Sequence, residues 1–139
     1  MSEPQPRPTN LTFVEIPLSE TPRETDERSF MLRPSRIAGV GVFITHPVKK
    51  GTYLALFLDD TIRRIPYSEM KKDPQLEAFC LVYGVEREDY CCVPHSFSKM
   101  EVGWFLNHSK TPNAGRDDGW RAIRDIAAGE EITIDYTNC

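Results

Sequence analysis

Glycine and proline interrupt this sequence so often that no long helix fits into it. The 139 residues include 8 glycines and 11 prolines, and the apolar runs between them are short. Proline lacks a backbone N–H donor and glycine has a permissive backbone, so both residues tend to end regular elements. Strands need only a few residues each, and we therefore expect a mainly β fold of several small sheets with few short helices.

Three segments have the composition of short strands. Residues 29–34 and 42–45 are largely apolar or β-branched. Residues 131–136 alternate between apolar and polar side chains, which is typical of a half-buried strand. Ile134 and Tyr136 then lie on the same, inward face of that strand.

Helix signals are concentrated in residues 67–83. Ser68 is the candidate N-cap of a helix over residues 67–72, because its hydroxyl can accept a hydrogen bond from the first turn. Pro74 interrupts that helix. Residues 75–83 fit a helix or a strand equally well.

Two distant turns share one pattern. Residues 48–54 and residues 126–132 each contain an apolar residue, a glycine three positions later and another apolar residue three positions after that. The pattern predicts two similar strand-turn-strand units, although it is too short to establish a true repeat.

The first 28 residues differ from the rest of the chain. They contain five of the eleven prolines, separated by Glu and Arg, so we expect a flexible N-terminal tail over residues 1–28, with residues 11–16 as its one candidate strand. Residues 29–139 are expected to form a single domain, and the 40% hydrophobic content is sufficient for a core.

Composition limits the partners of the chain. The net charge of −4 argues against a broad basic surface, so direct nucleic-acid binding is not expected and a basic protein partner fits better. No apolar run approaches the roughly 18 residues that span a bilayer. Residues 1–8 also lack the apolar core of a signal peptide. We expect no membrane association and an intracellular location.

The cysteines and histidines do not form a metal-binding pattern. Cys80, Cys91, Cys92 and Cys139 include no CxxC pair, and the three histidines have no helical pairing. We interpret the cysteines as reduced thiols, with Cys80 as a small core residue.

Two features have both a structural and a functional interpretation. Residues 39–41, Gly-Val-Gly, form either a tight turn or a stretch whose missing side chains let a flat cofactor approach the backbone. The residues after them favour a strand, which argues against a phosphate loop at a helix start. Tyr136 is either a core tyrosine with one hydrogen bond or a tyrosine at the bottom of an apolar slot.

A third feature is the apolar run that ends in Asn107-His108-Ser109. Residues 111–113, Thr-Pro-Asn, then force a turn. A nucleophilic Ser109 activated by His108 is poor chemistry, because adjacent residues of an extended chain point apart. The sequence around Ser109 also lacks a Gly-x-Ser-x-Gly elbow.

Taken in order, these segments resemble the SET family of protein lysine methyltransferases. Residues 39–41 look like its first glycine motif, residues 105–113 like its Asn-His-Ser-x-x-Pro-Asn motif, and residues 131–136 like its closing Glu-Leu-x-x-Asp-Tyr motif. The resemblance covers about residues 30–136. It implies a SET-type fold, in which small curved β-sheets surround a knot-like crossing of the C-terminal segment beneath the Asn-His-Ser loop.

The resemblance also implies S-adenosyl-L-methionine as cofactor and methyl transfer to a protein lysine, possibly on a histone tail. Asn107 would bind the amino group or carboxylate of the cofactor, and His108 would contact its adenine mainly through the backbone. Tyr136 would be the catalytic tyrosine and would line the substrate channel with Ile134. The residues implied to contact the cofactor are Ala38, Gly39, Val40, Gly41, Tyr90, Asn107 and His108.

Two positions depart from the family pattern. Lys110 stands where many members have a zinc-binding cysteine, and Cys139 is the last residue given, so we expect no zinc. The adenine pocket would then be covered by the N-terminal tail, by a second subunit in a homodimer, or by the substrate. Ile134 stands where many members have Phe or Tyr, which predicts a roomier, drier channel that permits di- or trimethylation.

Two other functions remain open at this stage. One is a SET-like protein- or peptide-binding module with little or no catalysis, and the other is an unrelated β-rich interaction domain. The joint presence of Asn107, His108 and Tyr136 favours the enzyme. The expected location is the nucleus in a eukaryote, and otherwise the cytoplasm or a host cell. The substrate lysine, the product and the oligomeric state are left open.

Overall fold

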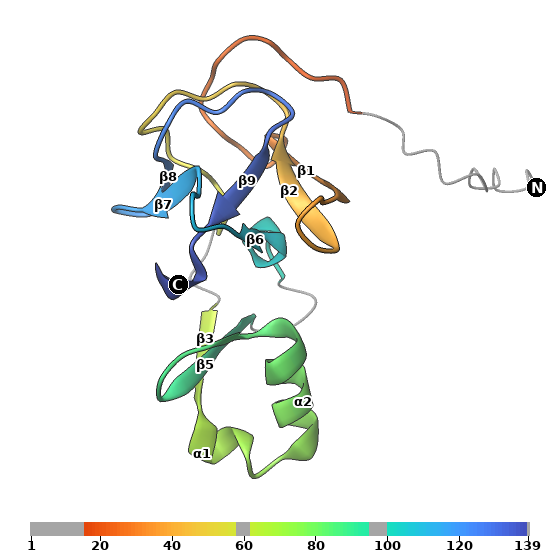
Figure 1. Ribbon diagram of the computed structural model, residues 1–139, viewed down its shortest axis with the longest axis vertical. Helices are drawn as coiled ribbons and strands as arrows, with labels where there is room; N and C mark the ends of the chain where they lie inside the picture. The colour runs from red at the N-terminus through yellow and green to blue at the C-terminus, as the bar shows by residue number, and fades with distance from the viewer. Residues whose placement is uncertain (1–15, 58–61, 95–99, 139) are drawn as a thin grey trace, which may run out of the picture.

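A four-stranded sheet forms the centre of the molecule (Figure 1). The computed structural model describes residues 16–57, 62–94 and 100–138. The strand order is β1 (Phe30–Pro34), β2 (Val40–Ile44), β9 (Glu131–Ile134) and β6 (Asn107–His108). The last strand in the sequence, β9, therefore lies inside the sheet, antiparallel to β2 and parallel to β6.

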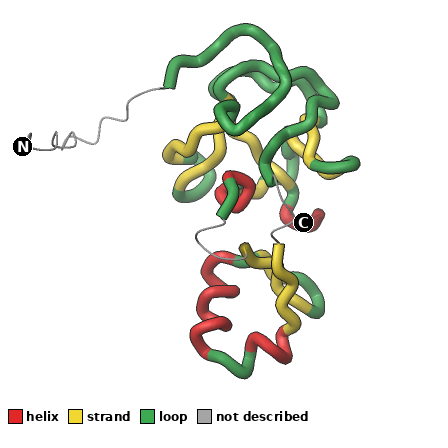
Figure 2. The backbone as a smooth tube through the Cα atoms, turned by 180° about the vertical axis from the view of Figure 1, so that it is seen from behind, coloured by secondary structure: helices red, strands yellow, loops and turns green. Residues whose placement is uncertain are grey.

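A second unit, residues 62–94, follows β1 and β2 in the sequence and precedes β6 and β9. Its three strands are β3 (Ile62–Pro66), β5 (Tyr90–Pro94) and β4 (Val85–Glu86), in that spatial order. Helices α1 (Tyr67–Met70) and α2 (Pro74–Tyr83) connect β3 to β4. We call this the inserted unit; it occupies the lower part of Figure 1, and Figure 2 shows it from behind.

The remaining elements are short. A hairpin of β7 (Ala114–Arg116) and β8 (Trp120–Ala122) forms the third sheet. Two 3-10 helices, η2 (Val102–Phe105) and η3 (Tyr136–Asn138), flank β6 and β9 respectively. Several small sheets with few short helices confirm the mainly β fold expected from the sequence.

Two separate cores stabilise these parts. The larger core contains fully buried residues of β2 and β9, such as Val42, Ile44 and Ile132. The smaller core lies within the inserted unit and includes Ile65, Cys80 and other small apolar residues. Cys80 is thus a core residue, as predicted, and its burial raises the pKa of its thiol. Cys91 and Cys92 are also buried, and neither forms a disulfide within the described residues.

The helical segment begins differently from the sequence prediction. The proposed N-cap at Ser68 is wrong: α1 starts at Tyr67, with Pro66 at the N-cap position and no side-chain cap. Residues 75–83, which were ambiguous, belong to helix α2. Pro74 starts this helix, and the side chain of Asp73 accepts hydrogen bonds from the N–H groups of Gln75 and Leu76.

The two similar turns lie next to each other in the fold. Val48 and Ile126 form an isolated antiparallel bridge with two backbone hydrogen bonds, at 3.0 and 2.9 Å. Gly51 and Gly129 have φ angles of +90° and +84°, a conformation that favours glycine. Both predicted turns are present, and the structure adds that they meet at the edge of the core.

The described half of the predicted tail runs along the body of the protein. The N–H of Ser19 donates to the carbonyl of Thr45, and the hydroxyl of Thr25 donates to the carbonyl of Tyr53. Residues 1–15, and with them most of the candidate strand at 11–16, lie outside the described residues. Among the described residues, no helix has the length and apolarity to cross a membrane.

The cap of α2 can be tested by Asp73→Ala. Removing an N-cap carboxylate leaves two N–H groups of the first turn without their acceptor, so we expect a loss of about 1 kcal/mol in the free energy of unfolding, measured by urea denaturation. Lys71→Ala, at a neighbouring exposed position, is the control and should change stability by less than about 0.5 kcal/mol. Equal effects from both variants would contradict the assigned cap.

Candidate active site

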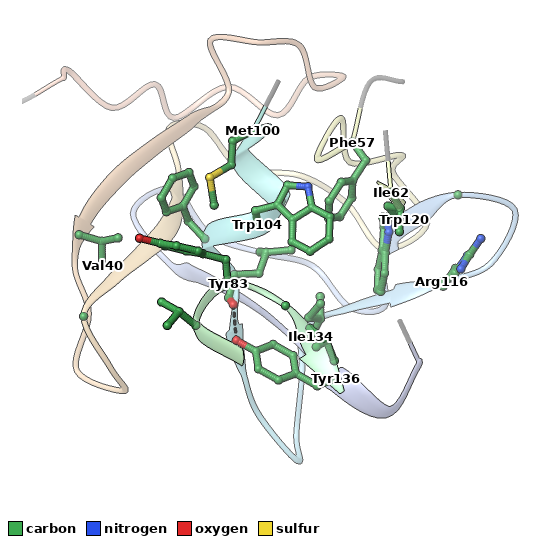
Figure 3. A pocket seen from close by; sticks show the side chains of 18 residues that line it. Val40, Phe57, Ile62, Tyr83, Met100, Trp104, Arg116, Trp120, Ile134 and Tyr136 are labelled. Carbon is green, nitrogen blue, oxygen red and sulfur yellow. Dashed lines mark hydrogen bonds between the residues drawn. The ribbon is translucent and has the colours of Figure 1, made fainter. Parts of the chain in front are cut away.

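A large pocket lies between the inserted unit and the central sheet (Figure 3). Its volume is about 980 Å³, and its walls are mostly apolar. Arg116 is the one charged side chain among the described residues that line it. The residues that line it include Gly39, Val40, Tyr83, Gly84, Val85, Leu106, Ile134 and Tyr136, together with Phe57, Trp104 and Trp120.

One wall of the pocket is the loop between β1 and β2. Gly39 has a φ angle of +47°, and no atom lies within 4 Å of the position that a Cβ would take. Backbone from this loop therefore faces open space. Gly41 is glycine for another reason, because a Cβ there would overlap the carboxylate of Glu131.

Glu131 holds this loop against the C-terminal strand. Its two carboxylate oxygens accept hydrogen bonds from the Ser35 hydroxyl at 2.8 and 2.9 Å. The side-chain N–H₂ of Asn107 donates to the same carboxylate at 2.9 Å. One carboxylate thus connects β9 to the loop before β2 and to β6.

Asn107 completes this network. Its side-chain nitrogen also lies 3.0 Å from the carbonyl oxygen of Ala38 and 3.3 Å from that of Val40, so its two N–H donors are shared among three acceptors. The side chain is buried and does not line the pocket. Asn107 therefore fixes the path of the backbone that does line the pocket.

Tyr136 lies at the base of the pocket. Its hydroxyl donates to the carbonyl oxygen of Leu106 at 2.5 Å (Figure 3, dashed line). Burial, and secondarily the nearby charge of Glu131, raises the pKa of Tyr136 above the ordinary value of 10.0. The tyrosine is therefore a neutral phenol at physiological pH.

His108 orients the backbone of Tyr136. The N–H of Tyr136 donates to Nδ1 of His108 at 3.1 Å, so Nδ1 is an acceptor and the proton of the neutral ring sits on Nε2. The 3.8 Å separation between Nδ1 and the Asp135 carboxylate is therefore not an ion pair in this state. Hydrogen bonds from the N–H and hydroxyl of Thr137 lower the pKa of Asp135.

The loop 106–113 is bound to β9 along its length. The N–H of Ser109 donates to the carbonyl of Ile134 at 3.0 Å. The side chain of Asn113 accepts from the N–H of Thr133 at 2.9 Å and donates to the carbonyl of Glu131 at 2.8 Å. These contacts bring the motif segments 105–113 and 131–136 together at one site. The knot-like crossing of the C-terminal segment stays a prediction.

The residues implied by the family resemblance divide into two groups. Gly39, Val40, Ile134 and Tyr136 line the pocket. Ala38, Gly41, Asn107 and His108 support these residues from behind, through the contacts described above. Tyr90 lies in β5 opposite Pro66 and does not line the pocket. A cofactor contact from Tyr90 stays a prediction.

Sequence reasoning missed two features of the site. The sequence did not single out Ser35, and it presented Glu131 only as part of a motif, because a contact across 96 positions leaves no local signal. The second feature is an aromatic wall, in which Phe57 lies 5.7 Å from Trp104 and 6.4 Å from Trp120, measured between ring centroids. Composition alone cannot place these rings together.

Metal chemistry finds no support in the described ranges. Within residues 16–57, 62–94 and 100–138, no three His, Cys, Asp or Glu side chains gather in an arrangement that holds a metal ion. The prediction that the protein binds no zinc stays a prediction.

Comparison with known proteins identifies the family. The SET domain family model matches residues 39–137. The chain is 28% identical over 123 residues to the N-lysine methyltransferase KMT5A-A of Danio rerio. This match covers 79% of this chain and 36% of that protein. It is 30% identical over 112 residues to the histone-lysine N-methyltransferase, H3 lysine-4 specific, of Schizosaccharomyces pombe. This match covers 74% of this chain and 12% of that protein.

The chain belongs to the SET domain family. It therefore shares its domain with lysine methyltransferases, while it spans only 36% and 12% of the length of these two relatives.

The Glu131 network can be tested by a double-mutant cycle. Gly41→Ala overpacks against the carboxylate and should cost about 1–3 kcal/mol. Glu131→Ala removes the acceptor of the Ser35 hydroxyl and one of the three acceptors of the Asn107 amide, so it should cost a similar amount, about 1–3 kcal/mol. The double variant removes the overlap, so its loss of unfolding free energy should be smaller than the sum by about 1 kcal/mol.

Gly51→Ala is the matched control for this cycle. Gly51 has a positive φ angle, which Gly41 does not, and the space at its missing Cβ is open. Its effect should add to that of Glu131→Ala within about 0.5 kcal/mol. Additivity in the Gly41 cycle as well would show that the carboxylate does not occupy the assigned position.

Proposed function

We propose that this protein transfers a methyl group from S-adenosyl-L-methionine to the side-chain amine of a protein lysine. The observation that carries the proposal is the position of Tyr136, whose neutral hydroxyl sits in an apolar pocket that also exposes the Gly39–Val40 backbone. Membership of the SET domain family supports it, because SET methyltransferases in general use this cofactor.

The residues of the pocket fit the cofactor. The volume of about 980 Å³ lies within the range of small-molecule sites. The open space at Gly39 lets a ligand approach the backbone closely. The backbone of Gly39 and Val40 would hold the cofactor, and Asn107 would hold that backbone in place. When bound, S-adenosyl-L-methionine would supply a methyl group on a cationic sulfur. An uncharged amine can accept that methyl group, and the sulfur is the leaving group.

The geometry of Tyr136 suits the positioning of such an amine. Because its proton is donated to Leu106, the phenol oxygen is left as an acceptor for an N–H of the lysine. The lone pair of the lysine nitrogen can then point away from the tyrosine, toward the methyl donor. Correct orientation of two reactants is worth roughly 7–11 kcal/mol of the barrier in favourable cases.

The pocket also favours the reactive form of lysine. An unperturbed lysine has a pKa of about 10.4 and is charged at neutral pH. Apolar walls disfavour the ammonium form, and Arg116 adds a like charge that acts in the same direction. The protein therefore promotes loss of the proton without a dedicated general base.

The substrate that we propose is a basic protein segment, with a histone tail as the leading candidate. One relative is named as acting on lysine 4 of histone H3, and the net charge of −4 suits a basic partner. We extend the proposal to an intracellular location, to the absence of direct nucleic-acid binding and to a homodimer that covers the cofactor pocket.

Tyr136→Phe tests the catalytic role. The variant keeps the ring but loses the hydroxyl, so we expect calorimetry to show cofactor affinity within a few-fold of the original. Methyl transfer to core histones, measured with radiolabelled cofactor, should fall by on the order of 100-fold or more. Tyr53→Phe, at an exposed tyrosine, is the matched control and should retain full transfer. Near-normal turnover by Tyr136→Phe would remove this residue from the mechanism.

Ile134 tests the control of the product. Its aliphatic side chain is 6% exposed and lines the pocket beside Tyr136 (Figure 3). We expect mass spectrometry of the product to show di- or trimethyllysine. Ile134→Phe should shift the product toward monomethyllysine by narrowing the channel, whereas Ile134→Val should not. Exclusive monomethylation by the unmodified protein would contradict the assignment.

A further inference from the structure

Arg87 ties the inserted unit to the C-terminal end of the described chain. Its Nη1 donates to the carbonyl oxygen of Thr137 at 2.8 Å and to that of Tyr136 at 3.3 Å. Both carbonyls belong to residues of η3, the element that follows β9. A guanidinium group is a charged donor, and hydrogen bonds from charged groups are stronger than those between neutral groups.

The backbone of Arg87 is anchored within the inserted unit. Its N–H donates to the carbonyl of Tyr90 at 2.8 Å, and its carbonyl accepts from the hydroxyl of Tyr67 at 2.5 Å. Tyr67 packs against the smaller core. The guanidinium group therefore reaches Tyr136 from a fixed point and not from a free loop.

Tyr136 is held at three atoms by three different residues. Leu106 accepts from its hydroxyl, His108 accepts from its N–H, and Arg87 donates to its carbonyl. Among the described residues, Arg87 is the one that makes such a hydrogen bond from the inserted unit. The other two contacts come from residues that flank or form β6.

The pocket lies between the two parts that Arg87 joins. Tyr83, Gly84 and Val85 line it from the inserted unit, and Ile134 and Tyr136 line it from the C-terminal segment. A hydrogen bond between these two sides limits how far they can separate. The position of the Tyr136 ring relative to the opposite wall therefore depends on Arg87.

We propose that Arg87 is a positioning residue for methyl transfer, which clamps the inserted unit to the backbone of Tyr136 and so fixes the Tyr136 hydroxyl in the pocket. The inference rests on the proposed function and deepens it. Arg87 touches neither the reacting amine nor the methyl group, and it acts through the tyrosine backbone.

The test compares Arg87→Ala, Arg87→Lys and Arg64→Ala in the full chain. Arg64 is an exposed arginine of β3 in the same inserted unit, and it serves as the control. Hydrogen exchange of residues 133–138, followed by mass spectrometry, reports the local opening of the C-terminal segment without any need for activity. Steady-state kinetics with radiolabelled cofactor then separate kcat from KM, and the melting temperature monitors global stability.

For Arg87→Ala we expect several-fold faster exchange in residues 133–138. We also expect a fall in kcat of about 10-fold, since small misplacements of a catalytic group are costly, with a smaller change in KM. Arg87→Lys should recover part of both losses, because an ammonium group can still donate to one of the carbonyls. Arg64→Ala should match the unmodified protein in both measurements.

Four results would overturn the inference. Unchanged exchange in Arg87→Ala would show that the clamp does not hold the C-terminal segment. Faster exchange with unchanged kcat would show a structural contact without a role in positioning. If the unmodified protein transfers no methyl group, the proposed function fails, and the positioning role fails with it even where exchange confirms the contact. A loss of kcat that accompanies global unfolding in both Arg87→Ala and Arg87→Lys also counts against the inference.

Discussion

The carboxylate of Glu131 is the interaction on which the site depends. It accepts hydrogen bonds from Ser35 and Asn107, and so joins the last strand to the loop before β2 and to β6. The same carboxylate occupies the space beside Gly41. Without it, the donors of Ser35 and Asn107 would lose their shared acceptor. Asn107 would then keep its hydrogen bonds to the carbonyls of Ala38 and Val40 but lose its side-chain link to β9.

The position of β9 inside the sheet makes this arrangement possible. Because β9 pairs with both β2 and β6, three segments far apart in sequence meet along one strand. Tyr136 follows that strand directly and reaches the base of the pocket. The inserted unit supplies the opposite wall, and Arg87 provides a hydrogen-bonded connection from that wall to the tyrosine backbone. The Gly39–Val40 loop, Tyr136 and the wall from the inserted unit are thus held by separate contacts.

Local patterns in the sequence predict the strands well and the contacts between them poorly. The strand expected over residues 131–136 exists as β9, but it ends at Ile134, and Tyr136 begins η3 and does not share a strand face with Ile134. The glycines at 51 and 129 lie in turns with positive φ angles, in line with the shared turn pattern. The cap at Ser68 was wrong because Pro66, with its restricted φ, takes the N-cap position instead. Links such as Ser35 to Glu131 depend on the folded topology, which no local pattern encodes. The family resemblance predicted which segments form the site, but it did not reveal that Asn107 faces the loop and not the pocket.

A crystal structure with S-adenosylhomocysteine, the product form of the cofactor, tests the central claim most directly. The account predicts electron density along the backbone of Gly39 and Val40, with the sulfur facing the hydroxyl of Tyr136 across the apolar pocket. Density bound elsewhere, or a sulfur turned away from Tyr136, would contradict it.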